Sequence, residues 1–299
     1  VESMRWLIGV CSSIILMSFG SGFVLGMNMY VDPFEELYGN AFSSGLVLSM
    51  GIQYFIGSIS VLISAWILNY YRLNTTQVQV LSGICSGFYS IAFLIPFALE
   101  TNDSNLLVIF MSIQGIPAGF LYMISIACLT FSLKEHSGSA IGLGLTAFGI
   151  GIVIGTQVIC ELLKHFSVIH SLYIVAGFLV IPSLISSCFI TIDSNDTQLN
   201  SDLVSCFDES IALKSWRLFT RKELLMLLLI TSAGSGPANG ILFSFSELAK
   251  DTLDLKLSQS TTLLSWLAIF QTLFRLIGGV CADRASLKSH SQLWSGAKN

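Results

Sequence analysis

Long apolar runs separated by short polar loops dominate the chain. A helix needs about 20 mostly apolar residues to cross the roughly 30 Å hydrocarbon core of a bilayer. Runs of this kind occupy residues 6–31, 39–70, 77–99, 106–133, 138–160, 170–192, 223–245 and 260–282. The runs are continuous rather than alternating, which excludes a membrane β-barrel. The pattern therefore predicts an all-α polytopic membrane protein with eight spanning helices.

Composition supports the membrane class. Of 299 residues, 53% are hydrophobic and only 11% are charged, whereas soluble domains contain about 25% charged residues. The net charge of −4 is small, and no basic cluster suggests nucleic acid as a partner. The lipid bilayer is therefore the first expected partner, and a monomer is the expected oligomeric state.

The positions of Lys and Arg predict an orientation. Cytoplasmic loops of membrane proteins carry an excess of these residues. With a cytoplasmic N-terminus, the cytoplasmic segments hold Arg5, Arg72, Lys134, Lys214, Arg217, Arg221, Lys222, Arg284, Lys288 and Lys298, and the outer loops hold Lys164, Lys250 and Lys256. We therefore predict a multi-pass protein with its N-terminus in the cytoplasm. The plasma membrane is the expected location, with an organelle membrane as the alternative.

The spans fall into two groups. Six follow one another closely, a polar stretch covers residues 193–222, and two more spans follow. This spacing predicts a six-helix bundle over residues 1–192, a cytoplasmic linker over 193–222 and a partial second bundle over 223–299. Six helices, a linker and a restart are typical of transporters built from two six-helix halves. We therefore expect an incomplete or truncated chain that ends after its eighth helix.

Small residues and prolines are spaced along the spans in ways that predict packing and kinks. Glycine pairs four residues apart are Gly22 and Gly26, Gly115 and Gly119, and Gly151 and Gly155. Four spans contain a proline: Pro96, Pro117, Pro182 and Pro237. Glycines at this spacing let membrane helices approach closely. Tight packing is the simpler interpretation of the pairs, and sliding of one helix past another during transport is the alternative.

Motifs for enzymatic chemistry are absent from the sequence. It contains no HExxH, GxSxG or P-loop motif, the patterns that would indicate a metalloprotease, a hydrolase or a nucleotide-binding enzyme. The seven cysteines form no CxxC pair, so neither a zinc site nor a disulfide framework is indicated. We predict that the protein is not an enzyme and that it uses no cofactor or metal.

Arg275 is the one charged residue deep inside a predicted span. A charge at the middle of a bilayer costs at least about 2.5–3.5 kcal/mol, and such residues usually face a water-filled cavity. A guanidinium presents a planar fork of donors that matches a carboxylate. We therefore predict that Arg275 faces a cavity and binds an anionic substrate. The alternatives are that its long side chain reaches the interface or that it pairs with a backbone carbonyl.

The stretch "GGVCADRASLK", residues 278–288, resembles the signature loop of the major facilitator superfamily. The matching residues are Gly279, Asp283, Arg284 and Lys288. In that superfamily the loop lies between helices two and three and again between helices eight and nine. The resemblance therefore implies a gating loop at these residues. The corresponding first copy, at residues 64–74, has Asn69 and Tyr70 where Asp and Arg are expected.

Two stretches resemble a narrower branch, that of the oxalate/formate antiporters and monocarboxylate transporters. Residues 115–151 look like its fourth and fifth helices, and residues 257–279 look like its eighth. The eighth helix of that branch carries an arginine that contacts the substrate carboxylate, and Arg275 matches it. Gln271 stands where proton-coupled members have Asp, and the first span contains no Lys. The resemblance therefore favours an antiporter-like member over a proton symporter.

These observations predict a transporter that moves small organic anions, either mono- or dicarboxylates, by alternating access. Arg275 would bind the carboxylate, with Gln271 one turn away on the same helix face. The other candidate binding residues are Tyr122, Asn28 and Asn239, each of which could instead satisfy a neighbouring helix. The alternatives are a carrier of another small nutrient, such as an amino acid or sugar, and a truncated membrane protein without transport.

Overall fold

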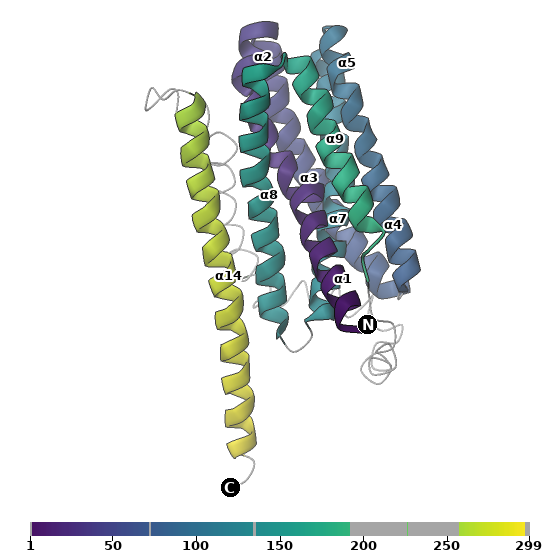
Figure 1. Ribbon diagram of the computed structural model, residues 1–299, viewed down its shortest axis with the longest axis vertical. Helices are drawn as coiled ribbons and strands as arrows, with labels where there is room; N and C mark the ends of the chain where they lie inside the picture. The colour runs from purple at the N-terminus through teal and green to yellow at the C-terminus, as the bar shows by residue number, and fades with distance from the viewer. Residues whose placement is uncertain (1, 72, 134–135, 192–225, 227–256, 297–299) are drawn as a thin grey trace.

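The computed structural model describes residues 2–71, 73–133, 136–191, 226 and 257–296 (Figure 1). Helices make up the described part, which contains no strand. Seven helical stretches there are long and apolar enough to cross a membrane: Trp6–Tyr38, Asn40–Leu68, Thr75–Glu100, Ser104–Ser132, Ser137–His165, Val168–Ser187 and Thr262–Arg284. They confirm the all-α membrane fold and seven of the eight predicted spans. The linker over 193–222 lies outside the described residues, as does the span over 223–245 apart from Met226.

Several spans are composite. The first consists of α1 (Glu2–Met17), a π-helical turn η1 (Ser18–Gly22), a 3-10 segment η2 (Phe23–Tyr30) and α2 (Val31–Tyr38). The third consists of α4 (Thr75–Phe88), the 3-10 segment η3 (Tyr89–Leu94) and α5 (Ile95–Glu100), and the fourth of α6 (Ser104–Ile113) and α7 (Gly115–Ser132). The remaining helices are α3 (Asn40–Tyr71), α8 (Ser137–His165), α9 (Val168–Ser187) and α14 (Leu257–Gly296).

The prolines account for part of this segmentation. Pro96 lies in the first turn of α5, directly after η3, and Pro117 lies in the first turn of α7. A proline lacks the backbone N–H and is tolerated best in the first turn of a helix, which is where each new segment begins. Pro182 instead lies inside α9. Pro237 lies outside the described residues.

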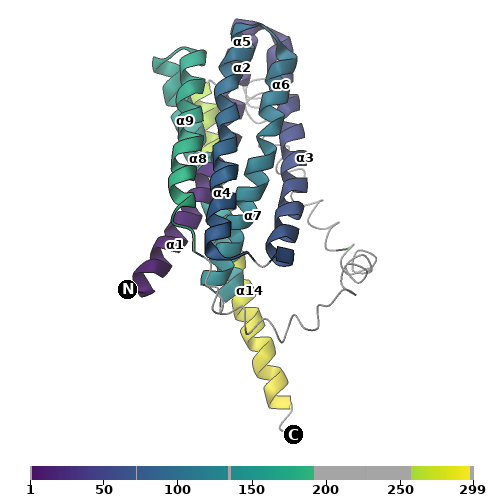
Figure 2. The same ribbon diagram turned by 90° about the vertical axis from the view of Figure 1, so that its right-hand side faces the viewer.

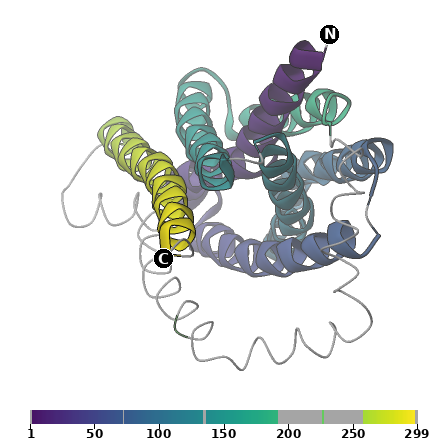
Figure 3. The same ribbon diagram turned by 90° about the horizontal axis from the view of Figure 1, so that it is seen from below.

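The first six spans pack side by side as a bundle, and α14 lies along the outside of α8 (Figures 1 and 3). Figure 2 shows that the described chain begins and ends at the same end of the bundle. Large apolar side chains such as Phe55, Leu62 and Trp66 on α3 are exposed. A continuous apolar exterior of this kind is what a bilayer solvates and water does not.

The glycine pairs lie at the closest helix crossings. A Cβ at Gly26 would lie 2.6 Å from the carbonyl carbon of Gly155, so the first span and α8 meet backbone to backbone. A Cβ at Gly119 would lie 2.7 Å from the Cβ of Ser60, so α7 packs in the same way against α3. These contacts confirm that the pairs serve tight packing. They leave the sliding of helices as an untested prediction.

Hydroxyl groups hold the irregular first span in place. Ser18 donates a hydrogen bond from Oγ to the carbonyl of Ala147 at 2.8 Å, and Ser21 donates to the carbonyl of Ala118 at 3.0 Å. Tyr89 donates from its hydroxyl to the carbonyl of Gly20. In lipid no water can satisfy backbone groups, so a π-helical turn needs side-chain partners from neighbouring helices. Tyr89 of η3 supplies such a partner to the Gly20 carbonyl, whereas Ser18 and Ser21 are donors of the turn itself and attach it to backbone carbonyls of α8 and α7.

A candidate substrate cavity beside Arg275

A cavity of about 350 Å³ opens between α14 and α8 on one side and the first span, α3 and α7 on the other. Its polar lining residues are Ser21, Gln53, Tyr54, Ser58, Tyr122 and Arg275. The rest of the described lining is glycine, alanine, valine, leucine and Phe148. None of the described lining residues is acidic. The described part of the lining is therefore mostly apolar, with Arg275 as its one cation.

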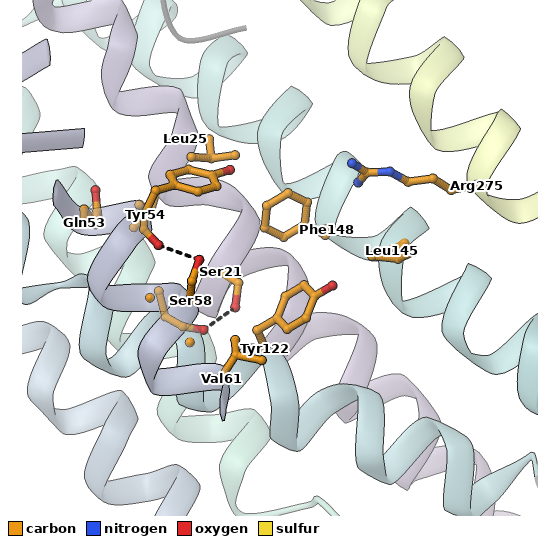
Figure 4. Close-up of a pocket in the computed structure, with 14 residues that line it drawn as sticks. Ser21, Leu25, Gln53, Tyr54, Ser58, Val61, Tyr122, Leu145, Phe148 and Arg275 are labelled. Atoms are coloured by element: carbon orange, nitrogen blue, oxygen red, sulfur yellow. Dashed lines mark hydrogen bonds between the residues drawn. The ribbon is translucent and has the colours of Figure 1, made fainter. Parts of the chain in front are cut away.

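Arg275 reaches this cavity from α14. Its guanidinium carbon lies 5.9 Å from the centroid of the Phe148 ring, and Figure 4 shows the side chain extending toward that ring and the cavity. A cation over an aromatic face is attracted by the ring quadrupole. The side chain is half-buried, and no described residue forms an ion pair with it. The guanidinium charge is thus left uncompensated by any carboxylate in the described part of the chain.

Close packing against α8 fixes the position of α14. A Cβ at Gly142 would lie 3.1 Å from the carbonyl oxygen of Arg275, so the two helix backbones come close together where α8 has a glycine. Farther along the same pair of helices, Gln157 donates from Nε2 to the Oγ of Ser265 at 2.8 Å. Because the helix backbones touch and a polar bond fixes their register, Arg275 has little freedom except in its own side chain.

Two of the signature residues, Gly279 and Asp283, lie at the far end of the same interface. Asp283 accepts hydrogen bonds from the backbone amides of Gly138 at 2.8 Å and Ser139 at 2.7 Å, and from the Ser139 hydroxyl. These amides belong to the first turn of α8, where four backbone donors lack intrahelical partners and the helix dipole favours an anion. One turn earlier, Gly279 packs against α8, since a Cβ there would lie 3.1 Å from the Cα of Gly142.

Gly279, Asp283, Arg284 and Lys288 all lie within α14 rather than in a loop, and their gating role stays a prediction. The segment contains no proline, and Ala282, Arg284, Ala285, Leu287 and Lys288 favour helices, so the helix continues past the apolar run. Helical geometry also places Gly279 and Asp283 one turn apart on the face that meets α8. Arg284 is exposed, and for Lys288 only the backbone is described.

A family model described as Major Facilitator Superfamily matches residues 14–297. The chain belongs to the major facilitator superfamily. It is therefore a multi-pass membrane transporter, and its substrates are small molecules that bind within the membrane. A comparison with curated proteins finds no match to the chain.

The structure brings some of the predicted binding residues of this major facilitator together and separates others. Arg275 and Tyr122 line the same cavity. Gln271, one turn from Arg275, is partly buried but does not line it. Asn28 is 2% exposed within η2 and also lies away from the cavity lining. Asn239 lies outside the described residues.

The sequence analysis missed the contribution of α3 to the cavity. Gln53, Tyr54 and Ser58 line it, and the Ser58 hydroxyl donates to the Tyr54 carbonyl at 2.9 Å (Figure 4). A signal was present, since Tyr54 and Ser58 are polar residues four apart on one helix face. Small polar residues are common in membrane spans, however, so this spacing did not distinguish a cavity wall from a helix contact.

Proposed function

We propose that this major facilitator carries small organic anions, mono- or dicarboxylates, and that Arg275 binds the substrate carboxylate. The observation that carries the proposal is the position of Arg275 in the wall of a cavity whose described lining holds no acidic residue. Keeping a charge at this depth is costly. A carboxylate that enters the cavity would pair with the guanidinium through two parallel hydrogen bonds.

The surroundings of Arg275 favour an anion over a neutral or cationic solute. The apolar walls, including Phe148, lower the local dielectric and strengthen the attraction between unlike charges. A cationic substrate would meet repulsion from Arg275 with no described carboxylate in the lining to offset it. A sugar or an amino acid remains the alternative substrate, and competition measurements separate the two.

Alternating access would move one bundle against the other about this cavity. The interface between α8 and α14 joins the first bundle to the second, so it would act as a surface along which the bundles rock. Its glycines allow close approach of the two helices, and the capping of α8 by Asp283 would stabilise one of the two arrangements of the bundles.

We further propose exchange of anions rather than proton symport, since Gln271 replaces the acid of the proton-coupled members. A cytoplasmic N-terminus and a plasma-membrane location complete the proposal.

The direct test measures uptake of labelled mono- and dicarboxylates into vesicles that contain the chain, with and without internal anion. Arg275→Ala should lower uptake by about 10- to 100-fold, because a hydrogen bond to a charged group contributes about 1.5–3 kcal/mol. Arg275→Lys keeps the charge but loses the planar fork, so its uptake should be intermediate.

Lys164→Ala provides the matched control. Lys164 is an exposed cation at the end of α8, paired with Glu161 at 2.7 Å, and its loss should leave uptake unchanged. Unchanged carboxylate uptake in Arg275→Ala would overturn the assignment of Arg275. Competition by sugars or neutral amino acids, without competition by carboxylates, would replace the proposed substrate class.

A further inference from the structure

Gln53 is a buried amide in the wall of the same cavity. Its side chain is 4% exposed, and its Nε2 has no hydrogen-bond partner in the described part of the chain. Nearly all buried polar groups in folded proteins are paired. Leaving a donor unpaired costs about 1–3 kcal/mol. An unpartnered donor beside a cavity is therefore a candidate contact for whatever enters that cavity.

A second unpartnered amide lies on the neighbouring helix. Gln114, at the break between α6 and α7, is 0% exposed, and neither its Nε2 nor its Oε1 has a partner among the described residues. It directly precedes Gly115, which packs against the backbone carbonyl of Gln53. One turn farther along α7, Ala118 lines the cavity. A second unsatisfied carboxamide thus follows directly from a backbone contact of Gln53, although Gln114 itself is not among the described lining residues.

Gln53 and Arg275 lie on opposite sides of the cavity, with Phe148 and the ring of Tyr54 between them (Figure 4). The wall between them is largely apolar, and Val24, Leu25 and Leu145 contribute to it. The described cavity therefore has two different poles, a guanidinium at one side and a neutral amide donor at the other. A solute that satisfies both needs a carboxylate and a separate, uncharged hydrogen-bond acceptor.

We infer that Gln53 binds an uncharged oxygen at the far end of a monocarboxylate substrate, so that hydroxy or keto acids are preferred to unsubstituted acids and to dicarboxylates. The inference rests on the proposed function, because it assumes that the carboxylate lies at Arg275. A second carboxylate at the amide pole would be buried without a cation, since the described lining holds no other Lys, Arg or His. A hydroxyl or carbonyl oxygen accepts from the amide at far smaller desolvation cost.

The experiment compares inhibition of uptake by matched acids in vesicles that contain the chain. The probes are butyrate and 4-hydroxybutyrate, hexanoate and 6-hydroxyhexanoate, and the dicarboxylate adipate. Because one hydrogen bond to a neutral group contributes about 1 kcal/mol, and an unmade one costs more, the hydroxy acid of at least one pair should bind about tenfold more tightly than its unsubstituted partner. Adipate should bind more weakly than 6-hydroxyhexanoate.

Two variants assign that preference to Gln53. Gln53→Leu and the less disruptive Gln53→Met should each bring the hydroxy acid and its unsubstituted partner to within about twofold of each other, because both remove the donor. Ser64→Ala is the matched control, because Ser64 lies on the same helix outside the described cavity lining and its hydroxyl already donates to the Val61 carbonyl. It should keep the preference.

The outcomes separate this inference from the proposed function. If carboxylates inhibit uptake but no hydroxy acid is preferred, or if the preference survives in a stably folded Gln53→Met protein, the role of Gln53 is overturned while Arg275 keeps its role. If no carboxylate inhibits uptake or is itself transported, the proposed function fails and this inference fails with it. The discrimination between carboxylates and their carboxamides should stay unchanged in both Gln53 variants, because Arg275 is intact.

Discussion

The carboxylate of Asp283 on α14 accepts a hydrogen bond from the backbone amide of Gly138 on α8 at 2.8 Å. The two residues are 145 positions apart in the sequence. Through this bond a side chain of α14, just past the eighth predicted span, caps α8, the helix of the fifth. The cap lies at the opposite end of the interface from the hydrogen bond between Gln157 and Ser265. Between these two bonds, α14 carries Arg275 against the glycine surface of α8.

Loss of the Asp283 charge should loosen the start of α8. In Asp283→Asn, the amide group can no longer accept from both backbone donors, and the interaction with the helix dipole is lost. We expect a loss of about 1 kcal/mol at this cap and faster hydrogen exchange at Gly138 and Ser139. Asp103→Asn is the control, since Asp103 caps α6 locally through the amides of Asn105 and Leu106. Exchange at α8 that does not differ between the two variants would contradict an interhelical role for Asp283.

A methyl group at Gly115 should destabilise the bundle. The added Cβ would overlap the Gln53 carbonyl and lie 3.0 Å from the Gly57 nitrogen, both of them backbone atoms that cannot rotate away. Overpacking of this kind costs about 1–3 kcal/mol, so Gly115→Ala should lower the thermal unfolding temperature in detergent. The control is Gly177→Ala on α9, where nothing lies within 4 Å of the added Cβ. That variant should be neutral or more stable by up to about 1 kcal/mol.

The π-helical turn of the first span should depend on Tyr89. Tyr89→Phe removes the hydroxyl that donates to the Gly20 carbonyl, and the loss of one such hydrogen bond costs about 0.5–1.5 kcal/mol. Tyr173→Phe is a matched change, because Tyr173 is exposed and its ring stacks on Phe93. Thermal unfolding in detergent should show a loss of stability for Tyr89→Phe only. Equal stability of the two would mean that the hydroxyl contributes nothing to the turn.

Phe148 should strengthen carboxylate binding indirectly. Its ring lies beneath the Arg275 guanidinium at 5.9 Å and helps to hold it at the cavity. Since such a contact is worth about 0.5–1 kcal/mol, Phe148→Leu should raise the KM for carboxylate uptake by about two- to fivefold. The maximal rate should change less. Phe93→Leu, at an aromatic pair away from the cavity, should leave the KM unchanged, and a parallel rise in both variants would count against the contact.

Much of the fold could be predicted from the sequence because a bilayer imposes a simple rule. Backbone groups in lipid must bond within their own segment, so a long apolar run becomes a helix. Seven spans and the tight packing at the glycine pairs followed from this rule and from residue size, whereas the partner helices of the pairs, α8 and α3, were not predicted. The segment at Asp283, expected as a loop, is helical because the end of the apolar run did not mark the end of the helix.

The candidate site could be predicted only in part. Arg275 stood out because a charge in an apolar run is rare, and Tyr122 does line the cavity beside it. Gln53 and Phe148 gave no comparable signal. In a membrane protein the lipid-facing and inward-facing sides of a helix are both apolar. The alternation of hydrophobic and polar residues that reveals the buried face of a soluble helix is therefore weak.

The sequence by itself determined that this chain is a helical membrane protein, where most of its spans lie and which residue carries an unusual charge. Hydropathy and residue size are local properties, and lipid turns them directly into helices and close crossings. Only the tertiary structure decided that α3 faces Arg275 across a cavity and that Asp283 reaches the amides of α8. Those relationships join residues more than a hundred positions apart, and they depend on which helix faces meet, which no local pattern in an apolar run specifies.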